Sequence, residues 1–359
     1  MKQPFYIKNL LFHCDPEWAH NSALFYFRFL KKTPFCEGYF KKKYFFTSKR
    51  IHQNILGLEF KNPLGLAAGF DKNGKVDSFL GALGFGFYEL GTVTLKAQSG
   101  FLGKRIHRFP EVKALVNRMG FPNEGVDVVR SRLEARFHDV PRGMSLGKNA
   151  TTLVDRASLE YAALLAKSFS FSDYFAINIS SPNTPELTKL QGKEFLSRLL
   201  SDIDQANQTM ADKYGVSKKP VFIKISPDLS DENLKELIAL IKDRSQYGVI
   251  ATNTTNNRKY FSSMMPEQGG LSGEPLKELS THMIRKVYEL TEGKIPIIGC
   301  GGIFTVEDAI EKIKAGASLL QIYTSFVYYG PSLVRQLSEG IDQYLRFHGI
   351  HHISELHAS

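Results

Sequence analysis

The chain has 359 residues, of which 43% are hydrophobic and 23% charged, and its formal net charge is +10. This is the composition of a soluble globular protein, and the length suits one large barrel with an appendage or two domains. No run of 18 apolar residues occurs, so we expect no membrane-spanning helix. Cys14, Cys36 and Cys300 form no CxxC pair and cannot all form disulfides, which favours a reducing compartment and no metal site.

The first fifty residues differ in composition from the rest of the chain. They hold ten Lys or Arg and three Asp or Glu, which is seven of the ten net positive charges, and 14 of the 43 aromatic residues. They lack the apolar core and cleavage site of a signal peptide. The remaining residues are nearly balanced in charge, so we expect no nucleic-acid partner. We predict a basic, aromatic helical arm at 1–50, a body at 51–345 and a C-terminal tail at 346–359.

Eight short apolar stretches follow the arm, and most are separated by helix-compatible segments. Ser230 and Thr305 begin two of these segments with the chemistry of a helix N-terminus. Continuous apolar strands separated by helices predict a parallel sheet buried on both faces, and eight units predict a (β/α)8 barrel of the TIM type, an α/β fold. A doubly wound open sheet is the alternative, but no GxGxxG opens a helix after the first strand. The predicted strands are Asn62–Gly69, Phe85–Val93, Met144–Gly147, Tyr174–Ile179, Val221–Ile225, Gly248–Thr252, Ile295–Cys300 and Leu319–Tyr323.

The carboxyl ends of these strands carry most of the polar residues that a catalytic site needs. In a barrel the site lies on that face, so residues far apart in sequence should converge there. Gly301-Gly302 and Tyr323-Thr324 follow the seventh and eighth strands, where barrels commonly bind phosphate. A tight turn is the simpler interpretation of the glycines. A phosphate site without a P-loop or dinucleotide fingerprint favours a mononucleotide cofactor such as FMN.

Two lysines at strand ends suit anionic groups. Lys224 lies within an apolar fifth strand, where an ammonium is costly to bury without an anionic partner. It would stabilise the negative charge of a reduced flavin, although a structural salt bridge is the alternative. Lys72 follows a glycine turn and could pair with a substrate carboxylate.

The stretch from Asn178 to Pro185 follows the fourth strand and displays amides and hydroxyls with no charged group. Such a surface suits a flat, neutral, amide-rich ring. Asn117, on a predicted loop, and Asn253 would add donors and acceptors, because an unpaired buried polar group costs about 1–3 kcal/mol. Taken singly, each asparagine is an ordinary turn residue.

These motifs together resemble class 2 dihydroorotate dehydrogenase, from about residue 4 to 340. The resemblance implies an FMN enzyme that oxidises dihydroorotate to orotate and passes electrons to a membrane quinone. The motifs that carry it are Asn62-Pro-Leu-Gly-Leu-Ala-Ala-Gly, Asn117-Arg-Met-Gly-Phe, Asn178-Ile-Ser-Ser-Pro-Asn-Thr-Pro, Ile250-Ala-Thr-Asn-Thr-Thr, Gly269-Gly-Leu-Ser-Gly and Ile297-Ile-Gly-Cys-Gly-Gly.

The resemblance also implies roles for single residues. Ser181 matches the catalytic base, where class 1 enzymes have cysteine. The residues that match orotate contacts are Lys72, Asn117, Arg118, Met119, Gly120, Phe121, Asn178, Asn183, Asn253 and Thr254. Those that match contacts to one FMN are Ala68, Gly69, Phe70, Asp71, Lys72, Thr92, Ser145, Asn178, Lys224, Thr252, Gly273, Gly302, Tyr323 and Thr324. Two depart from the family pattern: Ser145 stands in place of an asparagine and Thr324 in place of a serine.

Use of ubiquinone or menaquinone would explain the arm. Its aromatic residues could line an apolar mouth while its lysines face anionic lipid headgroups. The resemblance thus implies a monomer bound peripherally to the cytoplasmic face of a bacterial inner membrane. A capping subdomain packed on the barrel is the simpler interpretation of the arm.

Two other functions are open from the residues alone. One is a soluble FMN barrel that uses NAD or fumarate, or that reduces uracil in tRNA. The other is a non-enzymatic module that binds a membrane surface. Cysteine at position 181 or a basic C-terminal domain would favour the soluble enzymes, and neither is present.

Overall fold

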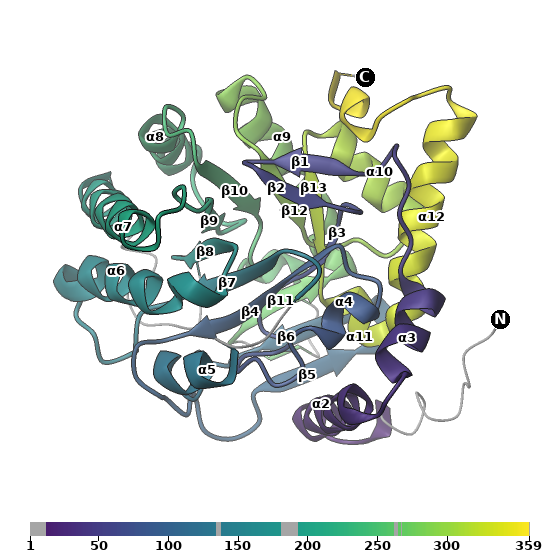
Figure 1. Cartoon of the computed structure of the whole chain (residues 1–359), viewed down its shortest axis with the longest axis horizontal. Helices are drawn as coiled ribbons and strands as arrows, with labels where there is room; N and C mark the ends of the chain where they lie inside the picture. The colour runs from purple at the N-terminus through teal and green to yellow at the C-terminus, as the bar shows by residue number, and fades with distance from the viewer. Residues whose placement is uncertain (1–11, 134–137, 181–192, 262–264, 267, 359) are drawn as a thin grey trace.

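Eight parallel strands close into a barrel in the computed structural model, which describes residues 12–133, 138–180, 193–261, 265–266 and 268–358 (Figure 1). Around the barrel the strand order is β10-β12-β13-β3-β4-β7-β8-β9. Each predicted strand is found, so the predicted barrel is confirmed. The strands are β3 (Leu64–Leu66), β4 (Phe87–Val93), β7 (Arg142–Leu146), β8 (Tyr174–Asn178), β9 (Val221–Ile225), β10 (Tyr247–Ala251), β12 (Ile297–Cys300) and β13 (Leu319–Ile322).

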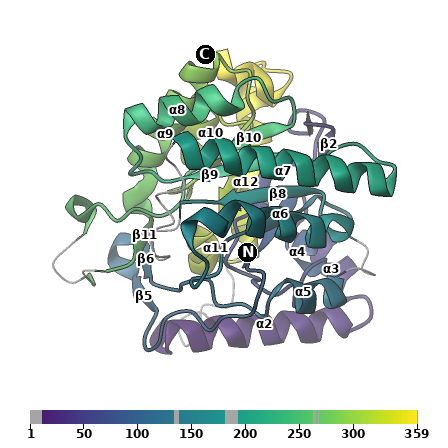
Figure 2. The same cartoon turned by 90° about the vertical axis from the view of Figure 1, so that its left-hand side faces the viewer.

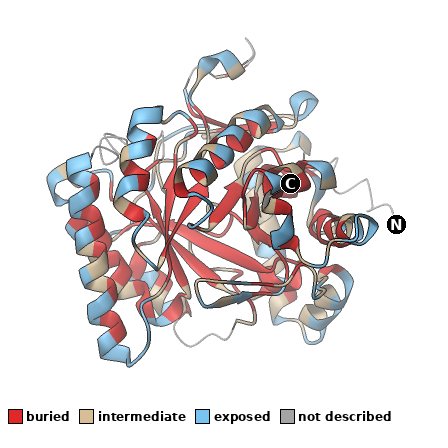
Figure 3. Cartoon of the chain, turned by 90° about the horizontal axis from the view of Figure 1, so that it is seen from above, coloured by how far each residue is buried: buried red, intermediate tan, exposed pale blue. Residues whose placement is uncertain are grey.

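Helices cover the outside of the barrel and turn their apolar sides towards it (Figure 3). Ser230 accepts a hydrogen bond from Asn233 N at the start of α8, and Thr305 forms a capping box with Asp308 at the start of α10. Both predicted helix starts are therefore confirmed. The helices of the body are α4 (Phe79–Ala82), α5 (Val126–Leu133), α6 (Ala157–Ser168), α7 (Lys193–Tyr214), α8 (Asp231–Ile241), α9 (Lys277–Thr291), α10 (Val306–Lys314), α11 (Thr324–Tyr329) and α12 (Pro331–Phe347).

Two small antiparallel sheets were not predicted from the sequence. A hairpin of β1 (Gln53–Ile55) and β2 (Leu58–Phe60) packs Phe60 against the apolar interior of the barrel. A three-stranded sheet of β5 (Ile106–Phe109), β6 (Ala114–Asn117) and β11 (Gly270–Gly273) lies in the loops at the other end. The prediction that Asn117 lies on a loop is wrong, because Asn117 ends β6 and pairs with both Ile106 and Gly270.

Within the described residues, the arm contains α2 (Pro16–Lys32) and α3 (Cys36–Tyr44), which pack on one side of the barrel (Figures 1 and 2). Asp15 caps α2 by accepting hydrogen bonds from Glu17 N and Trp18 N. Phe27 and Phe40 contact Phe79 of α4, with ring centroids 5.9 and 5.4 Å apart. One side of the arm is therefore bound to the body.

The other side of the arm is apolar and exposed. Its exposed aromatic residues, named here the aromatic face, are Trp18, Phe25, Tyr26, Phe29, Phe35 and Tyr39. Within the described residues, no helix is both long and apolar enough to cross a membrane.

The C-terminal segment after α12 packs against the body. Ile353 and Leu356 are buried, and Ile353 N donates to Arg50 O (2.9 Å). His352 Nε2 lies 2.7 Å from His52 O.

Candidate active site

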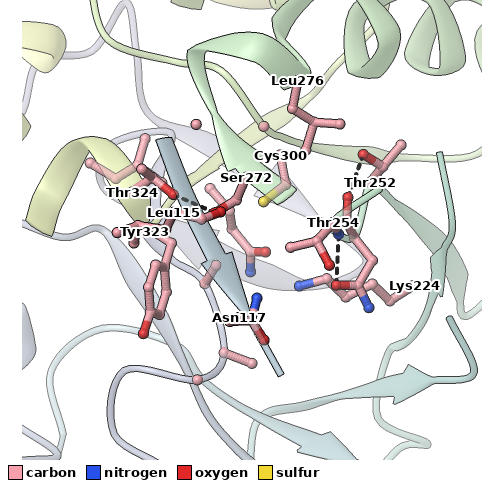
Figure 4. A pocket seen from close by; sticks show the side chains of 18 of the residues that line it. Leu115, Asn117, Lys224, Thr252, Thr254, Ser272, Leu276, Cys300, Tyr323 and Thr324 are labelled. Atoms are coloured by element: carbon pink, nitrogen blue, oxygen red, sulfur yellow. Dashed lines mark hydrogen bonds between the residues drawn. The ribbon is translucent and has the colours of Figure 1, made fainter. Parts of the chain in front are cut away.

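A pocket opens at the carboxyl ends of the barrel strands, with β6 and β11 forming part of its wall (Figure 4). It gathers residues from separate strand ends, as the barrel prediction requires. The predicted site residues that line it are Ala68, Gly69, Lys72, Thr92, Asn117, Met119, Gly120, Phe121, Asn178, Lys224, Thr252, Asn253, Thr254, Gly273, Gly302, Tyr323 and Thr324.

The amides in the pocket are oriented by hydrogen bonds to one another. Asn178 Nδ2 donates to Thr92 Oγ1 (3.1 Å), and its Oδ1 accepts from Asn253 Nδ2 (3.3 Å). Asn253 also donates to Ser180 Oγ (3.0 Å) and accepts from Thr254 N (2.9 Å). These side chains are thus fixed before a ligand arrives, which lowers the entropy cost of binding a planar polar ring.

The two lysines of the pocket have different surroundings. Lys72 Nζ donates to Gly69 O (2.6 Å), and burial together with nearby Arg105 lowers the pKa of Lys72 to about 8, although Glu17 and Asp71 oppose that shift. Lys224 is 6% exposed, and no hydrogen bond or ion pair joins its ammonium to a described residue. An ammonium that faces a pocket in this way is suited to an anionic ligand.

One end of the pocket is built from backbone at glycines. Gly301 and Gly302 have φ of 120° and 69°, and they pack against the start of α9. A Cβ at Gly302 would lie 2.3 Å from Lys277 Cα, so only glycine fits. Thr324 and Ser272 also line the pocket, and their Oγ1 and Oγ atoms lie 2.8 Å apart. Backbone N–H groups and hydroxyls are the donors that phosphate-binding sites commonly use.

Four predicted contact residues do not line this pocket. Asp71 accepts hydrogen bonds from Lys75 N, Val76 N and Asp77 N (2.8, 2.7 and 3.1 Å), so it shapes the loop that carries Lys72. Ser145 Oγ lies 2.9 Å from Thr92 Oγ1, behind the pocket wall. Arg118 stacks on Phe101, and Phe70 packs between Tyr323 and His20.

Ser181 and Asn183 lie outside the described residues. Their predicted roles therefore stay predictions. The strand that leads to them, β8, ends within the pocket at Asn178.

A second cavity lies between α2 and the body and shares Lys72 with the first. It is lined on one side by Glu17, His20 and Leu24 of α2, and on the other by Phe70, Arg105 and Met119 among others. Arg105 forms an ion pair with Glu17 across it. Burial and the charge of Lys72 lower the pKa of His20 to about 3, so its imidazole is neutral at physiological pH. Sequence reasoning missed His20 and Arg105, since neither belongs to a strand-end motif.

A family model and relatives that carry the same family name match this chain. The family model for dihydroorotate dehydrogenase matches residues 50–345. A protein named dihydroorotate dehydrogenase (quinone) from Christiangramia forsetii is 44% identical over 336 residues, covering 93% of this chain and 97% of its own. One of the same name from Trichormus variabilis is 41% identical over 371 residues, covering 98% and 96%.

Two solved structures with the same family name also match this chain. DHODH from Eimeria tenella in complex with ferulenol matches with a TM-score of 0.87 at 33% identity, covering 95% of this chain and 94% of its own. The ligand-free DHODH from the same organism matches with a TM-score of 0.85 at 34% identity, covering 95% and 98%.

Proposed function

The chain belongs to the quinone-dependent dihydroorotate dehydrogenase family, and from this premise we propose how its own residues perform the reaction. It oxidises dihydroorotate to orotate in pyrimidine biosynthesis. The soluble alternatives that use NAD or fumarate lose their support, because the relatives from Christiangramia forsetii and Trichormus variabilis are both named for quinone.

FMN fits the main pocket as the flavin of this flavin-dependent family. The Gly301-Gly302 turn with Thr324 suits its phosphate, and the Lys224 ammonium suits the edge of the ring that becomes negative on reduction. When bound by these residues, a flavin would supply the acceptor for the hydride of dihydroorotate and the donor of electrons for the quinone. The supporting observation is that Lys224 is buried, faces the pocket and pairs with no described residue.

The substrate would lie against the asparagines. Lys72 supplies a cation for the carboxylate of dihydroorotate, and Asn117, Asn178 and Asn253 supply amide donors and acceptors for its ring. Because Asn178 and Asn253 already hold one another, they can fix the plane of the ring with little loss of side-chain entropy.

Ser181 is the proposed base for the C5 proton. A serine hydroxyl is a weak base, so it must pass its proton onward or act with a lowered pKa. Its proposed role rests on the family motif.

We further propose that the arm delivers the quinone. The aromatic face would enter the lipid surface, while Lys32, Lys42 and Lys43 face anionic headgroups, each contributing about 1 kcal/mol. The cavity beneath α2 is lined by Glu17, His20 and Leu24 of the arm and reaches Lys72, at the border of the main pocket. The protein would thus act as a peripheral monomer on the cytoplasmic face of a bacterial inner membrane.

The cofactor proposal is tested by releasing the flavin from purified protein and identifying it. We expect one FMN per chain. Release of FAD, or of no flavin from a protein that folds, would contradict the proposal.

A further inference from the structure

The barrel interior holds a carboxyl group that the proposed mechanism does not use. Glu89 lies on β4, and its side chain is fully buried. Its neighbours come from other strands: Tyr174 of β8, Lys224 of β9 and Gln321 of β13. The side chains of Phe87, Phe222 and Leu319 lie two positions before Glu89, Lys224 and Gln321 on the same strands. They belong to the apolar interior of the barrel that packs against the β1–β2 hairpin. Because side chains alternate along a strand, Glu89, Lys224 and Gln321 form the next layer, nearer the pocket.

Of the two carboxyl oxygens of Glu89, Oε1 accepts hydrogen bonds from described residues and Oε2 does not. Gln321 Nε2 donates to Oε1 (2.6 Å), and Tyr174 OH donates to the same oxygen (3.3 Å). No donor among the described residues reaches Oε2, and Gln321 Oε1 lacks a donor as well. Two buried acceptors without donors would each cost about 1–3 kcal/mol.

A single proton on Glu89 Oε2 would satisfy both of these oxygens. If Oε2 carries hydrogen it can donate to Gln321 Oε1, while Gln321 Nε2 continues to donate to Oε1. This is the cyclic pair of a carboxylic acid with an amide, and it satisfies both groups. The alternative is an ionised carboxylate with a water between the two oxygens.

The electrostatic surroundings favour the protonated form. Burial raises the pKa of Glu89, against the opposing influences of Lys224, Gln321, Tyr174 and the Ala68 N–H. The Ala68 N–H faces the carboxyl without completing a hydrogen bond to Oε2. Among the described residues, the thiol of Cys300 on β12 also interacts with Glu89, and burial raises the pKa of this thiol too. Tyr174 and Cys300 are therefore neutral neighbours.

We propose that Glu89 is a positioning residue that carries a proton and pairs with Gln321, leaving the charge of Lys224 uncompensated beneath the pocket. An ionised Glu89 would neutralise part of that charge, and a negative reduced flavin would then face a weaker field. The effect on the flavin rests on the proposed function, whereas the protonation of Glu89 does not.

Infrared difference spectroscopy of the full chain as purified tests the proton directly. We expect a carbonyl band of a protonated carboxylic acid that shifts in D₂O and is lost in Glu89→Gln. Gln321→Leu should keep the band but move it to higher frequency, because the acid loses the carbonyl to which it donates. Asp308→Asn is the matched control: burial alone would raise the pKa of Asp308, but Lys277 and two backbone N–H groups outweigh it, so the band should persist.

A redox measurement tests the consequence. Because an amide mimics the protonated acid, Glu89→Gln should retain the wild-type flavin potential and flavin content at neutral pH. A potential that rises in Glu89→Gln, or a wild-type protein without the acid band, would overturn the proposal. If Glu89→Gln does not fold, the D₂O shift and the response to Gln321→Leu still decide. Absence of flavin would instead count against the proposed function and leave the infrared result intact.

Discussion

At the scale of single residues, the two lysines of the site differ in their surroundings. Lys72 borders both cavities and has a lowered pKa, while Lys224 lies deeper and faces only the main pocket. The first can respond to solvent pH and to the substrate, and the second is placed to act on a bound anion. We therefore expect substitutions of the two lysines to have different effects on the enzyme.

The pKa of Lys72 predicts a pH dependence of substrate capture. Lys72 is protonated below about 8 and loses its charge as pH rises through that value. We therefore expect kcat/KM for dihydroorotate to fall above about pH 8, with this limb absent in Lys72→Ala. Lys224→Ala should instead lose flavin or bind one that is harder to reduce. Equal effects of the two substitutions on flavin content would contradict the division of roles.

Ser181→Ala should bind flavin and orotate but reduce its flavin slowly. Removing a general base costs roughly 10²–10⁴-fold in rate. Stopped-flow measurement of flavin reduction by dihydroorotate gives the rate of this step. Ser181→Cys should retain some activity with a shifted pH optimum. A rate for Ser181→Ala within about threefold of wild type would show that another group takes the proton.

At the scale of elements, the site depends on short segments that must meet closely. The turn after β12 packs on the start of α9 at Gly302, where backbone approaches backbone. Such a position has no room for a side chain. A substitution there would therefore displace the backbone of both elements.

Gly302→Ala tests this contact. A residue with a Cβ in the left-handed region costs about 1–2 kcal/mol, and the contact with Lys277 adds to it. We expect a loss of at least about 2 kcal/mol in unfolding free energy in urea, together with lower flavin content. Gly38→Ala is the control: it lies in α3 with nothing within 4 Å of its Cβ, and should be neutral or stabilising. Equal unfolding free energies of the two variants would show that the close contact at Gly302 does not require glycine.

The barrel elements could be predicted because each strand is buried on both faces and reads as a continuous apolar run. The sequence did not predict β5, β6 and β11. β5 is only partly buried, and β6 pairs with Gly270 of β11, which lies more than 150 residues away in the chain. The strand-end asparagines and lysines were also predictable from position. The role of Asp71 was not, since sequence does not tell whether a carboxylate faces a ligand or three backbone N–H groups.

At the scale of the whole molecule, the proposed function assigns the two half-reactions to the barrel and the arm. The arm packs on the body through Phe27, Phe40 and the Glu17–Arg105 ion pair, and presents its other side outward. On the proposed function, substrate oxidation would need only the pocket, while a lipid-soluble acceptor would need the arm.

Replacing exposed residues of the aromatic face tests the arm without disturbing its packing. Phe25 and Phe29 are 73% and 63% exposed, so Phe25→Ser with Phe29→Ser should leave the fold and flavin reduction intact. Binding to anionic vesicles and turnover with a long-tailed quinone should fall several-fold, since about 25 cal/mol is lost per Å² of apolar contact with lipid. Salt should weaken vesicle binding of the unaltered protein. Undiminished vesicle binding by the double variant would show that the face has another purpose.

The most direct test follows the colour of the bound flavin under anaerobic conditions. Dihydroorotate should bleach the flavin of the purified protein and yield orotate. Addition of a soluble quinone should then restore the colour, whereas NAD⁺ and fumarate should not. A flavin that dihydroorotate fails to bleach, or whose colour NAD⁺ or fumarate restores as fast as quinone, would contradict the account.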